Sequence, residues 1–394
     1  MQKQKLIIIF TVFVDVVGFG IVIPILPYYV ATFGATAFTI TLLFSAFSFF
    51  AFISSPLLGA LSDRVGRRPI LLVSIVSTAI GWIVFAAANS IPLLFLGRII
   101  DGAAAGNFTI AQSYLVDIAK DERERTTNLG LIGATFGIGL MVGPFLGGVL
   151  SKVSHSFPFW FAGALALLNA TLAYFSLPET HHNRKSDAVL RVNPIAPLLR
   201  AIEQKHLRRY FAAWLLFGLA FFSSQSVFAL YAEHAFGFDA FMTGLLFTGM
   251  GVVMTVNQAV LLNSFWLNYF SEPSLARGMA AVVCIGLALM AAAWLPLFLI
   301  GLGLMATGQS VLRVVVTSQV AGRADPSMKG ETIGIMSSLM AAGMVLAPAL
   351  AGLMFEINEQ LPYIAGTLYM LGAVVLIHRQ LASDASTSSP IITS

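Results

Sequence analysis

Residues 6–30 read LIIIFTVFVDVVGFGIVIPILPYYV, and Asp15 is the only charged residue among them. A helix rises about 1.5 Å per residue, so about 20 apolar residues cross the roughly 30 Å hydrocarbon core of a bilayer. The segment is too long for a signal peptide, whose apolar core is typically about 7 to 15 residues. It therefore predicts a membrane-spanning helix with one acidic group near its middle.

The same pattern continues along the chain. Of its 394 residues, 58% are hydrophobic and only 10% are charged, whereas soluble domains carry about 25% charged residues. This composition argues against an ordinary soluble enzyme. Eleven more apolar runs follow, at 38–62, 69–88, 91–118, 127–150, 157–176, 209–232, 239–263, 275–294, 296–320, 330–355 and 359–380. We expect an all-α membrane protein with twelve transmembrane helices.

The longest polar stretch separates the sixth run from the seventh. It predicts an N-terminal six-helix bundle at 1–177, a cytoplasmic linker at 178–208 and a C-terminal six-helix bundle at 209–380. The Ser- and Thr-rich end, 381–394, is predicted to be a disordered cytoplasmic tail.

The two bundles are predicted to be parallel repeats. Parallel repeats of six helices place a shared site between the halves near the midplane of the membrane, and the halves rock about it. A shift of 204 positions places Pro92 on Pro296, Gly97 on Gly301, Gly130 on Gly334, Pro144 on Pro348 and Gly148 on Gly352 without a gap.

The basic residues predict the orientation in the membrane. Nineteen of the 22 Lys and Arg residues fall on alternate loops and at the two ends of the chain, and such an excess marks the cytoplasmic side. We expect a multi-pass membrane protein with both termini in the cytoplasm. The net charge of +4 is small and implies no nucleic-acid partner. A single cysteine, Cys284, excludes an internal disulfide and a cysteine metal cluster, and no metal site is expected.

Four motifs carry a resemblance to a known family. Residues 59–69 read GALSDRVGRRP, residues 98–102 read RIIDG, residues 139–148 read GLMVGPFLGG, and residues 15–27 read DVVGFGIVIPILP. The first three resemble the signature loop, the second motif and the antiporter motif of the major facilitator superfamily. The fourth resembles the tetracycline-efflux branch of its drug:proton antiporters. The resemblance implies the major facilitator fold in the inner membrane of a bacterial cell, with the proton gradient as driving force and no cofactor. Because both six-helix halves lie in one chain, we expect a functional monomer.

The loop at 59–69 is predicted to be a conformational latch. Glycine at 59 would permit a close backbone approach, and Asp63 would meet the positive end of the helix that begins near Gly330. The resemblance implies that Arg67 pairs with Asp117, and the network would hold the outward-facing state. The alternative is plain positive-inside anchoring. The corresponding loop of the second half lacks the pattern, so the latch would be one-sided. Its members are Gly59, Asp63, Arg64, Gly66, Arg67, Arg68 and Asp117.

The fifth predicted span carries glycines at a spacing of four. This spacing places them on one face and allows another helix to pack closely, while a proline within the run removes a backbone donor and is expected to bend the helix. The alternative is that the motif serves packing only, since its link to antiport comes from the resemblance alone. The motif residues are Gly139, Gly143, Pro144, Gly147 and Gly148.

Four ionisable residues lie within predicted spans: Asp15, Arg98, Asp101 and Arg313. Each costs about 2.5 to 3.5 kcal/mol at a span centre if unpaired, so each must be paired or hydrated. Low-dielectric surroundings disfavour a charged carboxylate and a nearby guanidinium favours it. We therefore expect Asp15 to carry the proton and Arg98 to tune the protonation of Asp15. Asp101 is expected to be the second partner of Arg98. The alternative is a static ion-pair network that only fixes the helices.

Polar residues at membrane depth are the candidates for substrate binding. At about 100° per residue, two of them on the fourth span share the face of Arg98 and Asp101, while Asn107 points the opposite way. For any single candidate, a hydrogen bond between helices is the alternative. The candidates are Thr109, Gln112, Gln225, Asn257, Gln258, Gln309 and Arg313.

Two transport functions remain open at this point. The first is export of an amphipathic drug-like compound, tetracycline-like or multidrug, in exchange for protons by alternating access. The second is proton-coupled import or export of an endogenous anionic metabolite or siderophore, because Arg313 has no acidic partner in its own half and suits a carboxylate. In either case the partners are a small molecule, protons and the lipid bilayer. The chain carries no phosphate-loop motif and no catalytic set in its spans, so it is not expected to be an enzyme.

Overall fold

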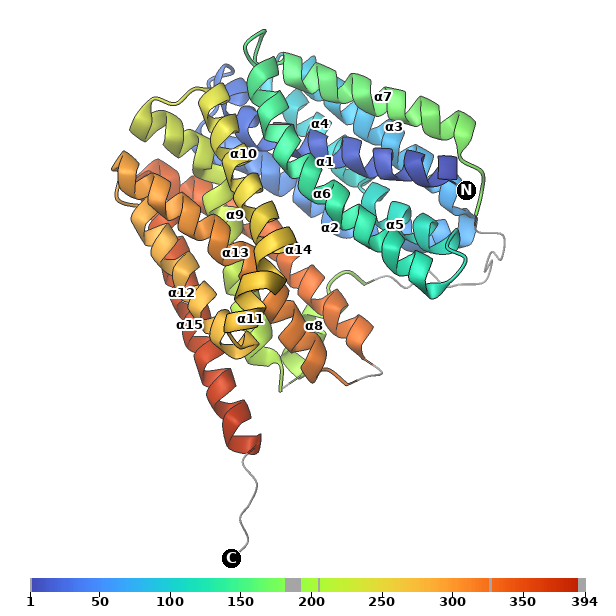
Figure 1. Ribbon diagram of the computed structural model, residues 1–394. Coiled ribbons are helices and arrows are strands. Elements are labelled where there is room, and N and C mark those ends of the chain that lie inside the picture. The colour runs from blue at the N-terminus through green and yellow to red at the C-terminus, as the bar shows by residue number, and fades with distance from the viewer. Residues whose placement is uncertain (1, 181–192, 205, 326–327, 389–394) are drawn as a thin grey trace, which may run out of the picture. The chain divides into compact units, whose positions relative to one another are not determined.

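The computed structural model describes residues 2–180, 193–204, 206–325 and 328–388 (Figure 1). Within these ranges the chain is helical and has no strands. Twelve segments are long and apolar enough to cross a membrane, which confirms the predicted all-α class and every one of the twelve predicted spans. The helices are α1 (Gln2–Ala31), α2 (Ala37–Val65), α3 (Arg67–Ala86), α4 (Ile91–Ala103), α5 (Asn107–Asp117), α6 (Glu122–Leu150), α7 (Phe157–Ser176), α8 (Ala196–Glu203), α9 (Arg208–Phe236), α10 (Ala240–Val256), the π-helix η1 (Asn257–Trp266), α11 (Leu267–Tyr269), α12 (Glu272–Met290), α13 (Leu295–Arg323), α14 (Lys329–Ile357) and α15 (Leu361–Ser388).

The fourth predicted span is two helices rather than one. Ser54 Oγ donates to the carbonyl oxygen of Gly102 at 2.7 Å, the oxygen that would accept the amide of Gly106 in a continuous helix. The Gly106 amide instead bonds to the carbonyl of Ala104 at 2.7 Å. Because two glycines also weaken helix propagation here, α4 ends at Ala103 and α5 starts afresh at Asn107.

Two further boundaries differ from the expectation. The linker contains the short helix α8, and α15 continues to Ser388, seven residues beyond the point where the tail was predicted to begin. Residues 381–388 contain no glycine or proline, so nothing in the sequence interrupts the helix. The rest of the predicted tail, 389–394, and the middle of the linker, 181–192, lie outside the described residues.

The chain packs as two compact units. One comprises Met1–Pro194 with Ser226–Gly251, and the other comprises Ile195–Gln225 with Val252–Ser394. The second part of α9 and most of α10 therefore pack with the first unit. The division into two bundles at the linker, which follows the sequence repeat, stays a prediction.

Close helix crossings at glycine recur in both units. In the first unit α3 crosses α4, where a Cβ on Gly97 would lie 2.8 Å from the carbonyl oxygen of Gly81. In the second unit α12 crosses α13, where a Cβ on Gly301 would lie 2.5 Å from the carbonyl oxygen of Gly286. Since Gly97 and Gly301 are equivalent in the 204-residue repeat, the same small-residue packing serves equivalent helices.

The glycine motif of α6 packs against α1, as its spacing predicts, and the two helices lie side by side in Figure 1. A Cβ on Gly143 would lie 2.8 Å from Gly20 Cα and from the Val17 carbonyl oxygen, and Gly139 and Gly147 meet α1 similarly. Pro144 lies inside α6. Gly148 faces the other way, because its Cβ would lie 3.1 Å from Phe241 Cα in α10.

We expect Gly143→Ala to lower the free energy of unfolding by about 1 to 3 kcal/mol, the usual cost of overpacking. The neighbouring atoms are backbone, so they can yield only if α1 and α6 separate. The matched control is Gly137→Ala in the same helix, whose added Cβ meets no described atom within 4 Å and should stabilise the helix slightly. Thermal unfolding in detergent measures both, and equal melting temperatures would contradict the prediction.

Candidate functional site

Asp15, Arg98 and Asp101 meet in one cavity of the first unit. The cavity has a volume of about 160 Å³ and brings together residues of α1, α2, α3, α4 and α5. All three residues predicted to couple protons line it. The full lining is Asp15, Phe19, Phe47, Thr78, Trp82, Arg98, Asp101, Ala105, Asn107 and Phe108.

Arg98 is buried between an acid and two aromatic rings. Only 2% of its surface is exposed, and its Nη1 lies 3.4 Å from Asp101 Oδ2. Its guanidinium carbon lies 4.3 Å from the ring centroid of Phe47 and 5.3 Å from that of Trp82. Ion pairing and cation–π contacts thus compensate for burial of the charge. Within the described part of the chain, Nε has no hydrogen-bond partner, so one donor is left over.

The side chain of Asp15 is held by Asn107, a residue that the sequence did not predict to belong to the site. Asn107 Nδ2 donates to Asp15 Oδ1 at 2.9 Å and to Thr78 Oγ1 at 3.2 Å. The expectation that Asn107 points away from Asp101 is wrong, because it assumed one continuous helix. The break between α4 and α5 changes the angular phase of every later residue. In the sequence, only the glycines at 102 and 106 indicate that the helix could break here.

Binding of one proton changes whether the cluster of Asp15, Arg98 and Asp101 carries a net charge. With both carboxylates ionised, Asp15, Asp101 and Arg98 sum to one negative charge, and uptake of a single proton makes the sum zero. A net charge in low-dielectric surroundings is unfavourable. The arrangement is therefore chemically suited to binding a proton in one state and releasing it in another.

The break also separates two substrate candidates from this cavity. Thr109 Oγ1 lies 3.1 Å from Ser55 Oγ of α2, and Gln112 is half-buried. Neither lines the cavity. The prediction that they share a face with Arg98 and Asp101 is wrong for the same reason as for Asn107.

The remaining substrate candidates belong to the second unit. Gln258 Nε2 donates to the Ser310 carbonyl oxygen at 3.3 Å, and Gln309 Nε2 lies 3.6 Å from Met254 Sδ. The buried Gln309 Oε1 accepts no hydrogen bond from the residues that the structure describes. Gln225 is half-buried and Arg313 is exposed.

Asn257 starts a π-helix, which the sequence pattern does not predict. Its Nδ2 donates to the Val253 carbonyl oxygen at 3.0 Å, the oxygen that its own amide would reach in an α-helix. Its Oδ1 accepts a hydrogen bond from Trp266 Nε1 at 2.9 Å, so the side chain joins the first and last residues of η1. Side-chain bonds of this kind compete with the α-helical ladder, and π-helical segments are frequent at functional sites.

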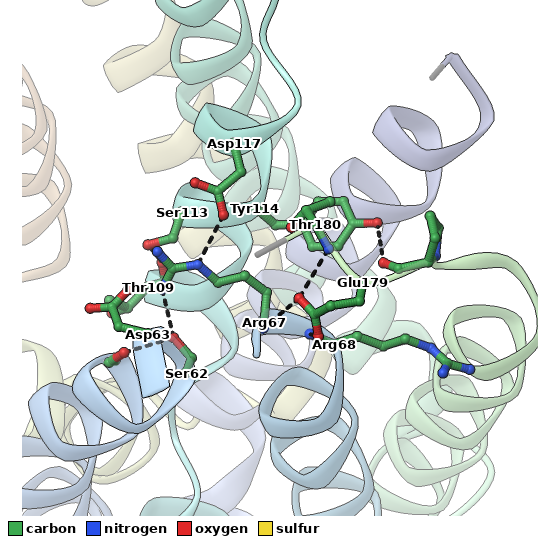
Figure 2. Close-up of polar contacts among 12 residues, drawn as sticks. Ser62, Asp63, Arg67, Arg68, Thr109, Ser113, Tyr114, Asp117, Glu179 and Thr180 are labelled. Carbon is green, nitrogen blue, oxygen red and sulfur yellow. Dashed lines mark hydrogen bonds and ion pairs between the residues drawn. The ribbon is translucent and has the colours of Figure 1, made fainter. Parts of the chain in front are cut away.

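The predicted latch is assembled at the ends of α2, α3 and α5 (Figure 2). Arg67 Nε lies 3.1 Å from Asp117 Oδ2, which confirms the predicted pair. Its Nη1 contacts Asp63 and donates to Ser62 Oγ at 2.7 Å. The side chain of Arg67 is only 10% exposed, so one guanidinium joins three partners in a largely buried place.

The other latch residues have distinct surroundings. Arg68 Nη2 donates to the Tyr174 carbonyl oxygen at 2.7 Å, and Arg64 is exposed. Among the described residues of its own unit, Gly59 lacks the expected close backbone approach, because the nearest atom to an added Cβ would be Thr109 Cγ2 at 3.5 Å. Gly59 faces a side chain there rather than a helix backbone. The contact of Asp63 with the start of α14 stays a prediction.

Twelve candidate spans and a cavity lined by charged residues are typical of a membrane transporter, and comparison with known proteins identifies the family. The chain belongs to the major facilitator superfamily, whose model matches residues 8–307.

Curated relatives and solved structures resemble the chain over nearly its full length. It is 27% identical to the quinolone resistance protein NorA of Staphylococcus aureus over 96% of the chain and 97% of that protein. It is also 27% identical to the class C tetracycline resistance protein of Escherichia coli, over 98% and 99%. The nucleoside transporter NupG superposes with a TM-score of 0.77 at 14% identity over 96% and 98%. The human organic anion transporter MFSD10 (TETRAN) superposes with a TM-score of 0.69 at 22% identity over 95% and 99%. The two structures support the fold alone.

Proposed function

We propose that this protein exports amphipathic drug-like compounds across the bacterial inner membrane in exchange for protons. The observation that carries the proposal is the cluster of Asp15, Arg98 and Asp101 in a cavity lined by candidate membrane spans, where Arg98 and Asp101 are buried. Buried ionisable groups in membrane spans are costly and typically mark ion or proton pathways. The resistance proteins that the chain resembles support export of a drug.

In the proposed cycle, Asp15 takes up a proton from one side of the membrane and releases it to the other. Its bond from Asn107 holds the carboxylate in the cavity, while the Arg98 and Asp101 pair sets the local charge. A change in the water access of the cavity, or in the Arg98 contact, shifts the balance between the charged and neutral carboxylate. Proton movement and the conformational change are thereby coupled.

The size of the cavity separates proton binding from drug binding. Its volume of about 160 Å³ is smaller than the pockets of about 300 to 1,000 Å³ that hold drug-sized ligands. We therefore assign the cavity to protons and water. The drug is assigned to the polar candidates outside it: Thr109, Gln112, Gln225, Asn257, Gln258, Gln309 and Arg313.

The latch completes the proposal. The Arg67 network at the ends of α2, α3 and α5 would stabilise the outward-facing state and open in the inward-facing one. We also propose that both termini are cytoplasmic and that the protein works as a monomer without a cofactor.

A second candidate function is proton-coupled transport of an endogenous organic anion. It is favoured by Arg98 Nε, a buried donor with no partner among the described residues, and by the cationic Arg313 of α13. A carboxylate would satisfy either arginine.

Proteoliposome flux distinguishes the two functions. The purified protein is reconstituted with an imposed pH gradient, and a labelled panel containing a tetracycline, a quinolone and small carboxylates is offered with and without an uncoupler. Uncoupler-sensitive transport of the drugs alone supports drug export, and transport of the carboxylates alone supports the second function. Transport of neither, in vesicles where a reference antiporter is active, would overturn both.

A further inference from the structure

The carboxylate of Glu179 contacts the backbone amides at the start of α3 (Figure 2). Its Oε1 accepts the backbone N–H of Arg67 at 2.9 Å, and its Oε2 accepts that of Arg68 at 3.2 Å. Oε1 also accepts the amide of Thr180 at 2.9 Å. Glu179 follows α7 and lies 112 positions from Arg67 along the chain, so a distant segment caps the helix that carries the latch.

This end of α3 has no cap of its own. The first amides of any helix lack partners within it and carry a partial positive charge. The N-cap residue Gly66 makes no side-chain hydrogen bond, and the first turn contains no acid, while the two leading residues are arginines. The Glu179 carboxylate satisfies two amides and opposes this concentration of positive charge.

Gly66 is shaped to admit the carboxylate. Its φ of 124° is a backbone conformation that favours glycine. A Cβ at this position would also overlap Glu179 Oε2. The glycine of the latch loop is therefore required by its own backbone, and a larger residue there would also displace the Glu179 carboxylate that lies against it.

The same segment is tied to both helices that build the latch. Tyr114, which precedes Asp117 by three residues in α5, donates its hydroxyl hydrogen to the Pro178 carbonyl oxygen at 2.8 Å. Arg68 of α3 donates to the carbonyl oxygen of Tyr174 at 2.7 Å. The end of α7 and the residues after it thus bridge the backbone of Arg67 and the helix of its partner.

We propose that Glu179 is a positioning residue of the latch. By fixing the backbone of Arg67 it aims the guanidinium at Asp117, and it ties the start of the linker between the two repeats to the same network. This inference rests on the proposed latch function, and it is independent of which compound is transported.

The test compares Glu179→Gln and Glu179→Ala with Glu122→Gln. Glu122 is an acid in the first turn of α6 with an 87% exposed side chain, so its neutralisation is the matched control. Hydrogen exchange by mass spectrometry reports on the start of α3 and on the end of α5. We expect about fivefold faster exchange at both places for the Glu179 variants, the order expected when a helix cap is lost, and no change for the control. Unchanged exchange at the end of α5 would overturn the proposal.

Transport supplies the second readout. We expect Glu179→Gln to lower the maximal rate about fivefold with little change in KM, and to have no additional effect in the Asp117→Asn background, where the latch is already broken. Additive effects of the two substitutions would overturn the positioning role. If the wild-type protein transports nothing but the exchange pattern is as expected, the proposed function fails while the positioning of Arg67 by Glu179 stands. Should Glu179→Ala fail to fold, Glu179→Gln alone carries the test.

Discussion

Replacing Asp15 by asparagine is expected to abolish proton-driven transport while the protein stays folded and still binds substrate. The amide has the same shape, and its oxygen can still accept the bond from Asn107 Nδ2 that holds Asp15. It cannot take up a proton. A gradient of one pH unit supports about a tenfold substrate ratio per exchanged proton, and this ratio should fall to about one in Asp15→Asn.

The measurement is substrate-induced proton release from the purified protein, together with gradient-driven uptake into proteoliposomes. The control is Asp239→Asn, at the start of α10, where the carboxylate accepts the Met242 amide at 2.8 Å and asparagine caps equally well. It should behave as the wild type. Proton release from Asp15→Asn at the wild-type level would refute the role of Asp15 as proton carrier.

The parts of the molecule that could be predicted are those set by local composition. A span is recognised from about 20 consecutive apolar residues, and all twelve were found in this way. The presence of Asp15, Arg98 and Asp101 within spans marked them as candidates, because an unpaired charge at that depth is too costly to be accidental. Their meeting in one cavity agrees with that reasoning.

The parts that could not be predicted depend on contacts between distant segments. The break after Ala103 follows from the bond of Ser54 to Gly102, which no periodicity in the fourth span reveals. It brings Asn107 to Asp15 and removes Thr109 from the cavity. Glu179 was missed for a similar reason, since a lone acid in a polar linker carries no sign of the helix end that it caps.

The resemblance to the family identified one contact that neither composition nor residue spacing predicts. The pairing of Arg67 with Asp117 spans 50 positions, and several other acids in the loops were equally available by sequence. The family motif singled out this pair correctly. It did not supply the third partner, Ser62, or explain the glycine at 66, and both required the geometry of the folded loop.

Removing the guanidinium of Arg67 is expected to lower the transport rate about tenfold or more. Arg67→Ala loses the contacts to Asp117, Asp63 and Ser62 together, and hydrogen bonds to charged groups contribute about 1.5 to 3 kcal/mol each. The state that the latch holds would lose population accordingly, since about 1.4 kcal/mol changes an equilibrium tenfold. Arg67→Lys should restore only part of the rate, because an ammonium group is a point charge and cannot reproduce the planar fork that reaches several acceptors.

The matched control is Arg64→Ala in the same loop. The motif includes Arg64 among the predicted latch residues, but Arg64 is exposed and lies outside the contacts of Arg67 with Asp117, Asp63 and Ser62. Its loss should therefore change the rate less than twofold, about the effect of a surface ion pair. Initial rates in proteoliposomes are compared at equal protein content. A single cysteine introduced at the Asp117 end of α5, in a Cys284→Ser background, reports opening of the latch by its rate of alkylation. The expected pattern is slow transport and fast alkylation in Arg67→Ala, with neither change in Arg64→Ala. Equal effects of the two substitutions would mean that the loop serves only as a positive anchor at the membrane surface, and the Arg67 network would then have no part in switching between states.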